Sequence, residues 1–167
     1  QAAPTMQQSM MMDPYSQQWI KHPNRTASIT EFWPESLDLC LYAVGVRIAR
    51  AAEWSVENSE MLCVVAYQAG EQYWPHFDCI TVDDPTAAEE LNRSGQRART
   101  VVVALNDDFK GGELRFCYAD HEVEPEVGTA IIYDNIMADG EIDEQSMHES
   151  MPVEQGIKWV AVKKMRV

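Results

Sequence analysis

The sequence is poor in features that would mark a metal finger, a dithiol enzyme or a membrane protein. Its 167 residues include four cysteines, and no two of them form a Cys-x-x-Cys pair. We therefore expect neither a zinc motif nor a redox motif, and reduced thiols are the default in a cytoplasmic protein. No apolar run reaches the length of a membrane span, and no secretory leader opens the chain. These absences predict a cytoplasmic protein without a membrane partner.

Basic residues are also scarce. The chain has 13 lysines and arginines against 27 acidic residues, a formal net charge of −14. Such a surface repels phosphate backbones, so we expect no nucleic-acid partner. A neutral or basic peptide remains compatible with this charge.

The chain contains no internal repeat, and its length suits one domain. Residues 1–18, rich in Met and Gln, are predicted to form a flexible N-terminal arm, and residues 19–167 a single domain. Because the first residue is Gln1 rather than Met, we expect the chain to be the C-terminal part of a longer protein.

The apolar pattern changes once along the chain. Residues 35–54 carry apolar side chains at intervals of three or four, which predicts one amphipathic helix buried through Leu37, Leu41, Val44, Ile48 and Ala52. Short β patterns follow at 62–67, 73–80, 100–105, 113–118, 129–134, 147–150 and 157–163. Residues 107–112 are predicted to be a turn and residues 83–96 an irregular loop. Many short strands favour a mainly β jelly roll, whose narrow end can hold a small ligand.

Histidine is rare as well, with four in the chain. His76 and Asp78 stand two residues apart in a predicted strand, so both side chains point to one side. With His148 they supply two imidazoles and one carboxylate, the ligand set of mononuclear Fe(II) oxygenases. The other histidines, His22 and His121, lie before the predicted core and in a polar turn, and we expect both to be exposed.

Lys158 follows His148 by ten residues, and residues 151–156 between them resemble a turn. A hairpin centred on residue 153 would set the two opposite each other, about 5–6 Å apart at the backbone. A lysine in an apolar strand is costly unless an anion meets it or it points outward as a surface lysine. We therefore expect Lys158 to provide the counter-charge for a dicarboxylate bound to the metal.

At this point the chain resembles the prolyl 4-hydroxylase-like 2-oxoglutarate- and Fe(II)-dependent dioxygenases over about residues 20–164. The resemblance is carried by an ordered series of motifs: Arg25-Thr26-Ala27-Ser28, residues 67–78, Arg97-Ala98-Arg99-Thr100, Leu105-Asn106-Asp107, Gly111-Gly112-Glu113, Ser146-Met147-His148 and Gly156-Ile157-Lys158-Trp159. It implies a double-stranded β-helix with Fe(II) held by His76, Asp78 and His148. It also implies 2-oxoglutarate and O2 as co-substrates, with Lys158 paired to the far carboxylate and ascorbate as reductant.

The resemblance also suggests roles for further residues. Tyr67 matches a family tyrosine near the co-substrate, and Tyr73 one near the peptide substrate, with simple ring packing as the alternative for both. Arg97 matches an arginine that can contact substrate, although Arg99 beside it competes for the assignment.

The chain departs from the family pattern at three positions. Leu114 stands where prolyl hydroxylases have a threonine, and Ala104 where many have a tyrosine. Both family residues can assist the lysine, so we expect the hydroxyl of Thr100 to take over this task. Lys164 stands where a tryptophan often shapes the substrate site.

The resulting hypothesis is an enzyme that hydroxylates a prolyl residue in a peptide or protein, with succinate and CO2 as co-products. Two alternatives remain open: the same chemistry on a free amino acid or other small molecule, and a catalytically silent jelly-roll domain that binds metal and 2-oxoglutarate. The oligomeric state is not predictable from these residues.

Overall fold

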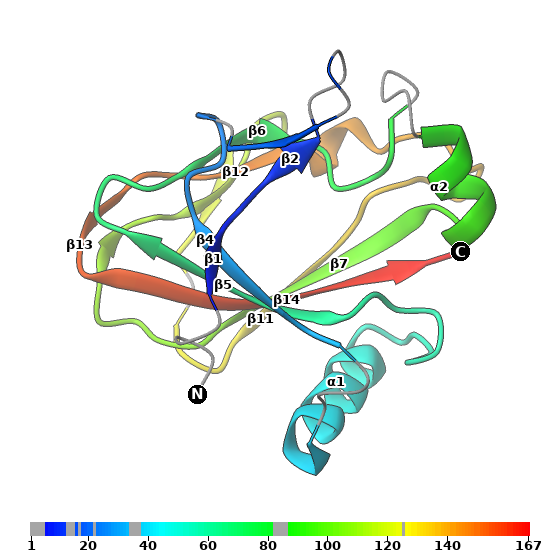
Figure 1. Cartoon of the computed structure of the whole chain (residues 1–167), viewed down its shortest axis with the longest axis horizontal. Coiled ribbons are helices and arrows are strands. Elements are labelled where there is room, and N and C mark those ends of the chain that lie inside the picture. Colours follow the sequence, from blue (N-terminus) through cyan, green and yellow to red (C-terminus); the bar gives the residue numbers. More distant parts are fainter. Residues whose placement is uncertain are drawn as a thin grey trace.

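Two facing layers of antiparallel strands form the body of the molecule (Figure 1). The computed structural model describes residues 6–12, 16, 18–21, 23–33, 38–81, 87–124 and 126–167. This arrangement confirms the predicted mainly β jelly roll. Within the described residues, no helix has the length and apolarity to cross a bilayer.

The larger layer is a six-stranded sheet with a non-sequential strand order. Its strands, in order across the sheet, are β1 (Gln7–Gln8), β4 (Ser28–Phe32), β5 (Leu62–Gln68), β14 (Ile157–Arg166), β7 (Arg97–Ala104) and β11 (Ala130–Asp134). The central position of β14, between β5 and β7, places the last strand of the chain in the middle of the core.

The smaller layer is a four-stranded sheet, in the order β10 (His121–Val123), β9 (Leu114–Phe116), β12 (His148–Ser150) and β6 (Tyr73–His76). Two short pairs complete the β structure: β2 (Met11–Met12) with β3 (Trp19–Ile20), and β8 (Lys110–Gly111) with β13 (Val153–Gln155). The 3-10 helix η3 (Glu144–Ser146) leads into β12.

Side chains of β14 alternate between two environments, as the period of a strand requires. One face turns to the space between the sheets and carries Lys158, Val160, Val162 and Lys164. The opposite face packs toward a helix through Trp159, Ala161 and Met165. A single strand therefore supplies both the apolar core and two cations of the inner cavity.

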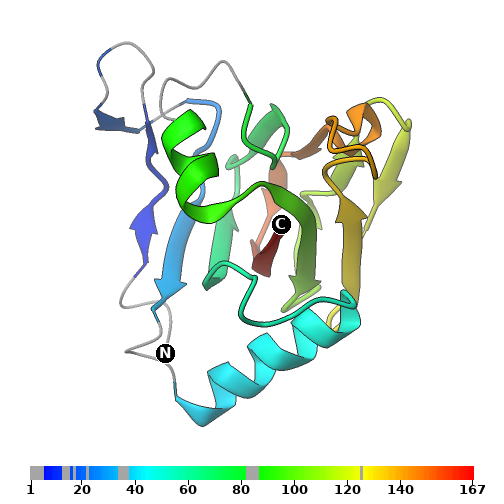
Figure 2. The ribbon, with the colours of Figure 1, turned by 90° about the vertical axis from the view of Figure 1, so that its right-hand side faces the viewer.

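Helix α1 (Leu39–Ala51) covers the outer face of the six-stranded sheet, away from β6 and β12 (Figures 1 and 2). The side chain of Asp38 caps its start by accepting a hydrogen bond of 2.8 Å from the backbone of Leu41. Ile48 and Ala49 are buried against the sheet, where Met165 is completely covered.

The helix predicted over 35–54 is thus confirmed with shorter bounds, and residues 35–37, including Leu37, lie outside the described part. One of its predicted core positions is wrong, because Val44 is exposed. The other described positions of the predicted stripe are confirmed, because Ile48 and Ala52 are buried and Leu41 packs against the same cluster. Gly45 and Ala49 are buried beside them.

Two predicted irregular segments contain regular structure. Helix α2 (Ala87–Ser94) lies inside the segment 83–96 that we predicted as a loop, while residues 83–86 are outside the described part. Alanine, glutamate and leucine have high helix propensity, and a prediction from the polarity of the segment overlooked this. The predicted turn at 107–112 includes β8, and the seven predicted strands are all present with bounds that differ by a few residues.

Part of the predicted N-terminal arm lies against the body. Strand β1 pairs with β4, and the backbone of Ser9 donates a 2.8 Å hydrogen bond to Ala27. The flexibility of residues 1–18 and the division of the chain at residue 19 stay predictions.

Candidate metal and co-substrate site

Strand pairing brings the two candidate histidine ligands together. His76 ends β6, His148 begins β12, and the two residues are direct partners in the antiparallel ladder. Their rings lie 4.3 Å apart. Asp78 follows two residues after His76, just beyond the end of the strand. One potential ligand atom from each of the three side chains lies within 4.8 Å of the others.

The two imidazoles are oriented by backbone carbonyls. His76 Nδ1 lies 2.7 Å from the carbonyl oxygen of Trp74, and His148 Nδ1 lies 2.8 Å from that of Ser146. These contacts keep the proton on Nδ1, so each Nε2 carries the lone pair that can bind a metal. The hydroxyl of Tyr133 lies 3.0 Å from Nε2 of His148. The Nε2 atoms lie 3.9 Å and 3.8 Å from the carboxylate oxygens of Asp78.

Two imidazole nitrogens and one carboxylate oxygen match the donor set that Fe(II) accepts in oxygenases. The protonation states agree with this assignment. Burial and the nearby His148 lower the pKa of His76 to about 3, so its ring is neutral at physiological pH. The side chains present therefore fit a divalent iron ion.

Asp78 is buried and surrounded by donors. Lys164 Nζ lies 2.8 Å from Oδ1. At Oδ2, the hydroxyl of Thr100 donates at 2.8 Å and that of Tyr133 at 3.0 Å. Burial opposes ionisation of Asp78, but the charge of Lys164 and its hydrogen bond to the carboxylate outweigh it, so the pKa lies well below its usual value. The carboxylate is thus kept ionised and ready to bind a cation.

Lys158 points inward, with 3 % of its surface exposed. Its Nζ donates to the carbonyl oxygen of Gly112 at 2.6 Å and to the hydroxyl of Ser150 at 2.8 Å. Burial lowers its pKa from 10.5 to about 8. Tyr67 is its partner across the β5–β14 ladder, and the Lys158 ammonium lies 5.1 Å from the Tyr67 ring centre.

The predicted hairpin between His148 and Lys158 is wrong. β12 belongs to the smaller sheet and β14 to the larger one. Residues 153–155 between them form β13, which pairs with β8, so the chain crosses from one layer to the other. His148 and Lys158 line the same cavity from opposite layers.

The placement of Thr100 also corrects an expectation. Its hydroxyl is bonded to Asp78 and receives a 3.0 Å hydrogen bond from the side chain of Asn135. In the β7–β14 ladder Thr100 stands opposite Lys164, six positions along β14 from Lys158. At about 3.3 Å per residue this is roughly 20 Å, too far for Thr100 to assist Lys158.

Tyr73 and Arg97 both line the cavity. The ring of Tyr73 stacks on His76 with 3.5 Å between centroids, and the guanidinium carbon of Arg25 lies 5.0 Å from the centre of the Tyr73 ring. Arg97 Nε bonds Glu60 at 2.6 Å. The substrate contacts of Tyr73 and Arg97 stay predictions.

A register shift at the end of the β7–β14 ladder separates Arg97 from its competitor Arg99. Arg99 turns away from the cavity, donates to Asp134 at 2.6 Å and lies over the ring of Trp54. Arg97 is therefore the arginine that reaches the site. His121 is exposed, as expected, and His22 lies outside the described residues.

The cavity between the layers has a volume of about 230 Å³. It includes residues whose place in the site the sequence did not reveal, among them Tyr133, Ser150 and Arg25. Lys164 was noted only as a departure from the family pattern. The sequence did contain a signal for the position of Lys164. It follows Lys158 by six residues, and an even spacing places both side chains on one face of a strand.

Residues 62–166 match the family model described as the 2OG-Fe(II) oxygenase superfamily. Among curated proteins, the chain is 37% identical over 120 residues to prolyl 4-hydroxylase subunit alpha-1 of Bos taurus, covering 72% of this chain and 22% of that protein. It is 29% identical over 184 residues to prolyl 4-hydroxylase 1 of Arabidopsis thaliana, covering 99% of this chain and 62% of that protein. The chain thus spans about a fifth of the alpha-1 subunits that it matches.

Among solved structures, the fold is similar to that of the viral collagen prolyl hydroxylase of Paramecium Bursaria Chlorella virus-1 in its 2OG complex. The TM-score is 0.70 at 21% identity, covering 86% of this chain and 81% of that one. A prolyl-4-hydroxylase from Pseudomonas putida gives a TM-score of 0.57 at 21% identity, over 93% of this chain and 76% of that one. These likenesses concern the fold.

Proposed function

This chain belongs to the 2OG-Fe(II) oxygenase superfamily, and from this premise we propose that it hydroxylates a prolyl residue in a peptide or protein, with Fe(II) as metal and 2-oxoglutarate and O2 as co-substrates. One observation carries the proposal. His76, Asp78 and His148 place their ligand atoms within 4.8 Å of one another, in the cavity that also holds a buried lysine. Ascorbate is the reductant we expect.

Each protein group has a defined task in this reaction. His76, Asp78 and His148 would hold the metal on one side and leave its other positions to ligands. Bound Fe(II), together with 2-oxoglutarate and O2, supplies the oxidising chemistry that hydroxylates a C–H bond and yields succinate and CO2. Thr100 and Tyr133 orient Asp78 through its Oδ2 atom.

Lys158 is the proposed partner of the far carboxylate of 2-oxoglutarate. A lysine ammonium has three donor hydrogens, and Gly112 and Ser150 use two of them. The third is available to an anion, which would also relieve the cost of burying the charge. Tyr67, across the ladder from Lys158, is proposed to form a wall of the same subsite.

A prolyl substrate is supported by the relatives, which are named prolyl 4-hydroxylases. We propose that Tyr73 packs against the prolyl ring, because its ring already stacks on His76 beside the metal position. Arg97, held by Glu60, is proposed to contact the peptide on the other side of the cavity.

The test is turnover of a panel of prolyl peptides and free proline, with succinate measured and products weighed for one added oxygen atom. We expect hydroxylation that requires both Fe(II) and 2-oxoglutarate. His76→Ala is expected to abolish it, whereas His121→Ala, which changes an exposed histidine on β10, is expected to retain it. Metal and 2-oxoglutarate binding without product from any substrate would contradict the proposal and favour a silent binding domain.

A further inference from the structure

Cations are concentrated in the inner cavity of this acidic chain. Four of its 13 basic residues line the cavity, namely Arg25, Arg97, Lys158 and Lys164. Three carboxylates face them, those of Glu31, Glu60 and Asp78. The two positive charges of Fe(II) and the two negative charges of 2-oxoglutarate cancel. One positive charge in the loaded cavity is then left without a counter-charge.

Two of the four cations keep their partners when the site is loaded. Lys158 is assigned to the co-substrate. Arg97 is bonded to Glu60 at 2.6 Å and lies 3.6 Å from Glu90. The remaining candidates for an additional anion are Arg25 and Lys164.

Arg25 is incompletely satisfied. Its Nε atom is buried and has no hydrogen-bond partner among the described residues. Its guanidinium lies 5.0 Å from the ring centre of Tyr73, which in turn stacks on His76. Arg25 is thus held beside Tyr73 and close to the metal position, with an unused donor.

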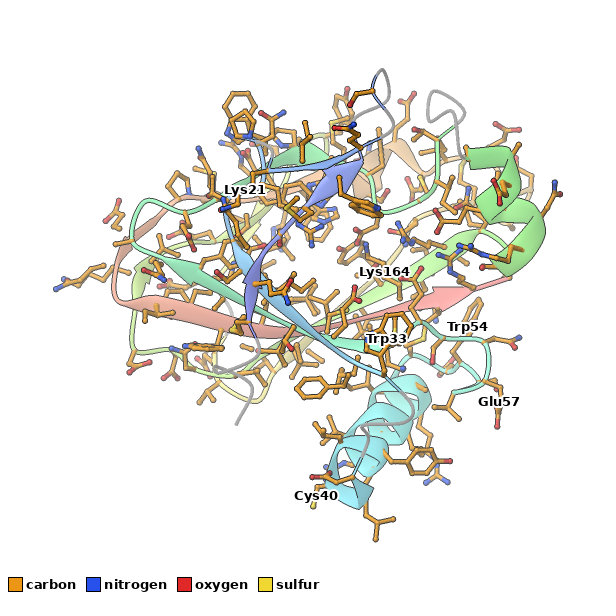
Figure 3. All side chains as sticks on the ribbon, in the orientation of Figure 1. Lys21, Trp33, Cys40, Trp54, Glu57 and Lys164 are labelled. Atoms are coloured by element: carbon orange, nitrogen blue, oxygen red, sulfur yellow. The ribbon has the colours of Figure 1, made fainter. Side chains whose placement is uncertain are left out.

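Lys164 pairs with Asp78, a residue that is also a proposed metal ligand. Its Nζ lies 2.8 Å from Asp78 Oδ1. Figure 3 shows Lys164 on the side of β14 that faces the smaller sheet. When Asp78 binds Fe(II), its negative charge is drawn to the metal, and the Lys164 ammonium is left able to pair with a ligand anion.

We propose that the substrate carries a carboxylate that pairs with Lys164 and Arg25, and this proposal rests on the proposed function. The carboxylate belongs either to an acidic side chain next to the target proline or to the α-carboxyl group of a proline that ends the peptide. The total charge of −14 does not oppose this. Surface charges are screened over about 8 Å at physiological ionic strength, whereas charges inside the cavity act at short range.

The experiment compares two matched substrate pairs. The first is a peptide with blocked ends and one internal proline, flanked by Glu in one member and Gln in the other. The second is a peptide that ends in proline, with a free carboxylate in one member and a carboxamide in the other. Affinity is measured by calorimetry with the Mn(II)- and 2-oxoglutarate-loaded protein without oxygen, and kcat/KM with Fe(II).

In the parent protein, the acid member of at least one pair is expected to bind about tenfold better than its amide, equivalent to about 1.4 kcal/mol. The pair that discriminates identifies the source of the carboxylate. Lys164→Met is expected to reduce the ratio to below about threefold. Lys110→Met, a change of an exposed lysine outside the cavity, is the matched control and is expected to keep the ratio. Arg25→Met provides a second variant if Lys164→Met fails to fold.

Equal affinities for acid and amide in both pairs would overturn the inference. The inference is also overturned if Lys164→Met and Arg25→Met weaken 2-oxoglutarate binding but leave the ratio of acid to amide affinities unchanged. Hydroxylation of acid and amide with equal efficiency leaves the proposed function standing and removes the inference alone. Discrimination in binding without any hydroxylated product removes the proposed function and retains the carboxylate site.

Discussion

Replacing Lys158 with Met removes the proposed counter-charge of 2-oxoglutarate without removing much volume. Lys158 is 3 % exposed, so a carboxylate bound there would lose its partner in a buried setting. Truncating one partner of a buried charge pair costs about 2–5 kcal/mol. A central value of about 3 kcal/mol predicts that the Kd for 2-oxoglutarate rises roughly 100-fold. Calorimetry with the Mn(II)-loaded protein measures this directly, and Lys110→Met serves as control.

The loss is not expected to come from unfolding. Burial lowers the pKa of Lys158 from 10.5 to about 8, and at 1.36 kcal/mol per unit this is a penalty of about 3 kcal/mol at neutral pH. Methionine relieves that penalty but leaves Gly112 and Ser150 without a donor, at about 1–1.5 kcal/mol each. The two contributions nearly cancel, so the free energy of unfolding should stay within about 1 kcal/mol of the parent.

The same pKa predicts the pH dependence of co-substrate binding. Below pH 8 the lysine is protonated and the Kd for 2-oxoglutarate is expected to be flat. Above pH 8 the free protein increasingly holds a neutral amine, so the Kd should rise by up to tenfold per pH unit. In Lys158→Arg the guanidinium stays charged and the profile should be flat. The reasoning is refuted if Lys158→Met binds 2-oxoglutarate as tightly as the parent, or if the parent Kd is constant from pH 7 to pH 10.

Three further results are expected. Lys164→Met should bind Mn(II) about tenfold more tightly in calorimetry, because the ammonium that competes for Asp78 is removed; weaker or unchanged binding contradicts this. Thr100→Val should weaken Mn(II) binding about tenfold or more and leave the 2-oxoglutarate Kd unchanged, because the lost hydrogen bond reaches the Asp78 carboxylate and not Lys158. Thr100→Ser is the control, and an effect on 2-oxoglutarate binding alone would contradict this assignment. Met165→Ala should lower the free energy of unfolding by about 3 kcal/mol and Tm by roughly 10 °C in a thermal scan, because the Met165 side chain is 0% exposed. Met165 lies on the face of β14 opposite the cavity, so kcat/KM at 25 °C should be preserved. A Tm equal to the parent's would refute that packing.

The ligand set was accessible from sequence because it depends on short-range rules. His76 and Asp78 are two residues apart, and with four histidines in the chain His148 remained once His22 and His121 were set aside as exposed. Lys158 stood out because a lysine within an apolar strand requires an anion. The alternation of β14 then placed Val160 and Val162 on the same inner face.

What the sequence did not reveal depends on how distant strands pair. The route from His148 to Lys158 crosses between two sheets, because residues 153–155 pair with β8, and a local turn pattern contains no trace of that partner. Tyr133 reaches Asp78 because β11 pairs with β7 in a register that sets it opposite Thr100. Helix α2 has eight residues, about two turns, so its apolar positions Ala87, Ala88 and Leu91 are too few for periodicity to detect.

The most direct test of the site is a crystal structure with Mn(II) and 2-oxoglutarate, grown without oxygen. The expected result is one ion held by His76, Asp78 and His148, chelated by the 2-oxo acid end of the ligand, with the far carboxylate on Lys158 Nζ. An ion bound elsewhere, or one whose coordination positions are all filled by protein side chains, would contradict the proposed oxygenase site.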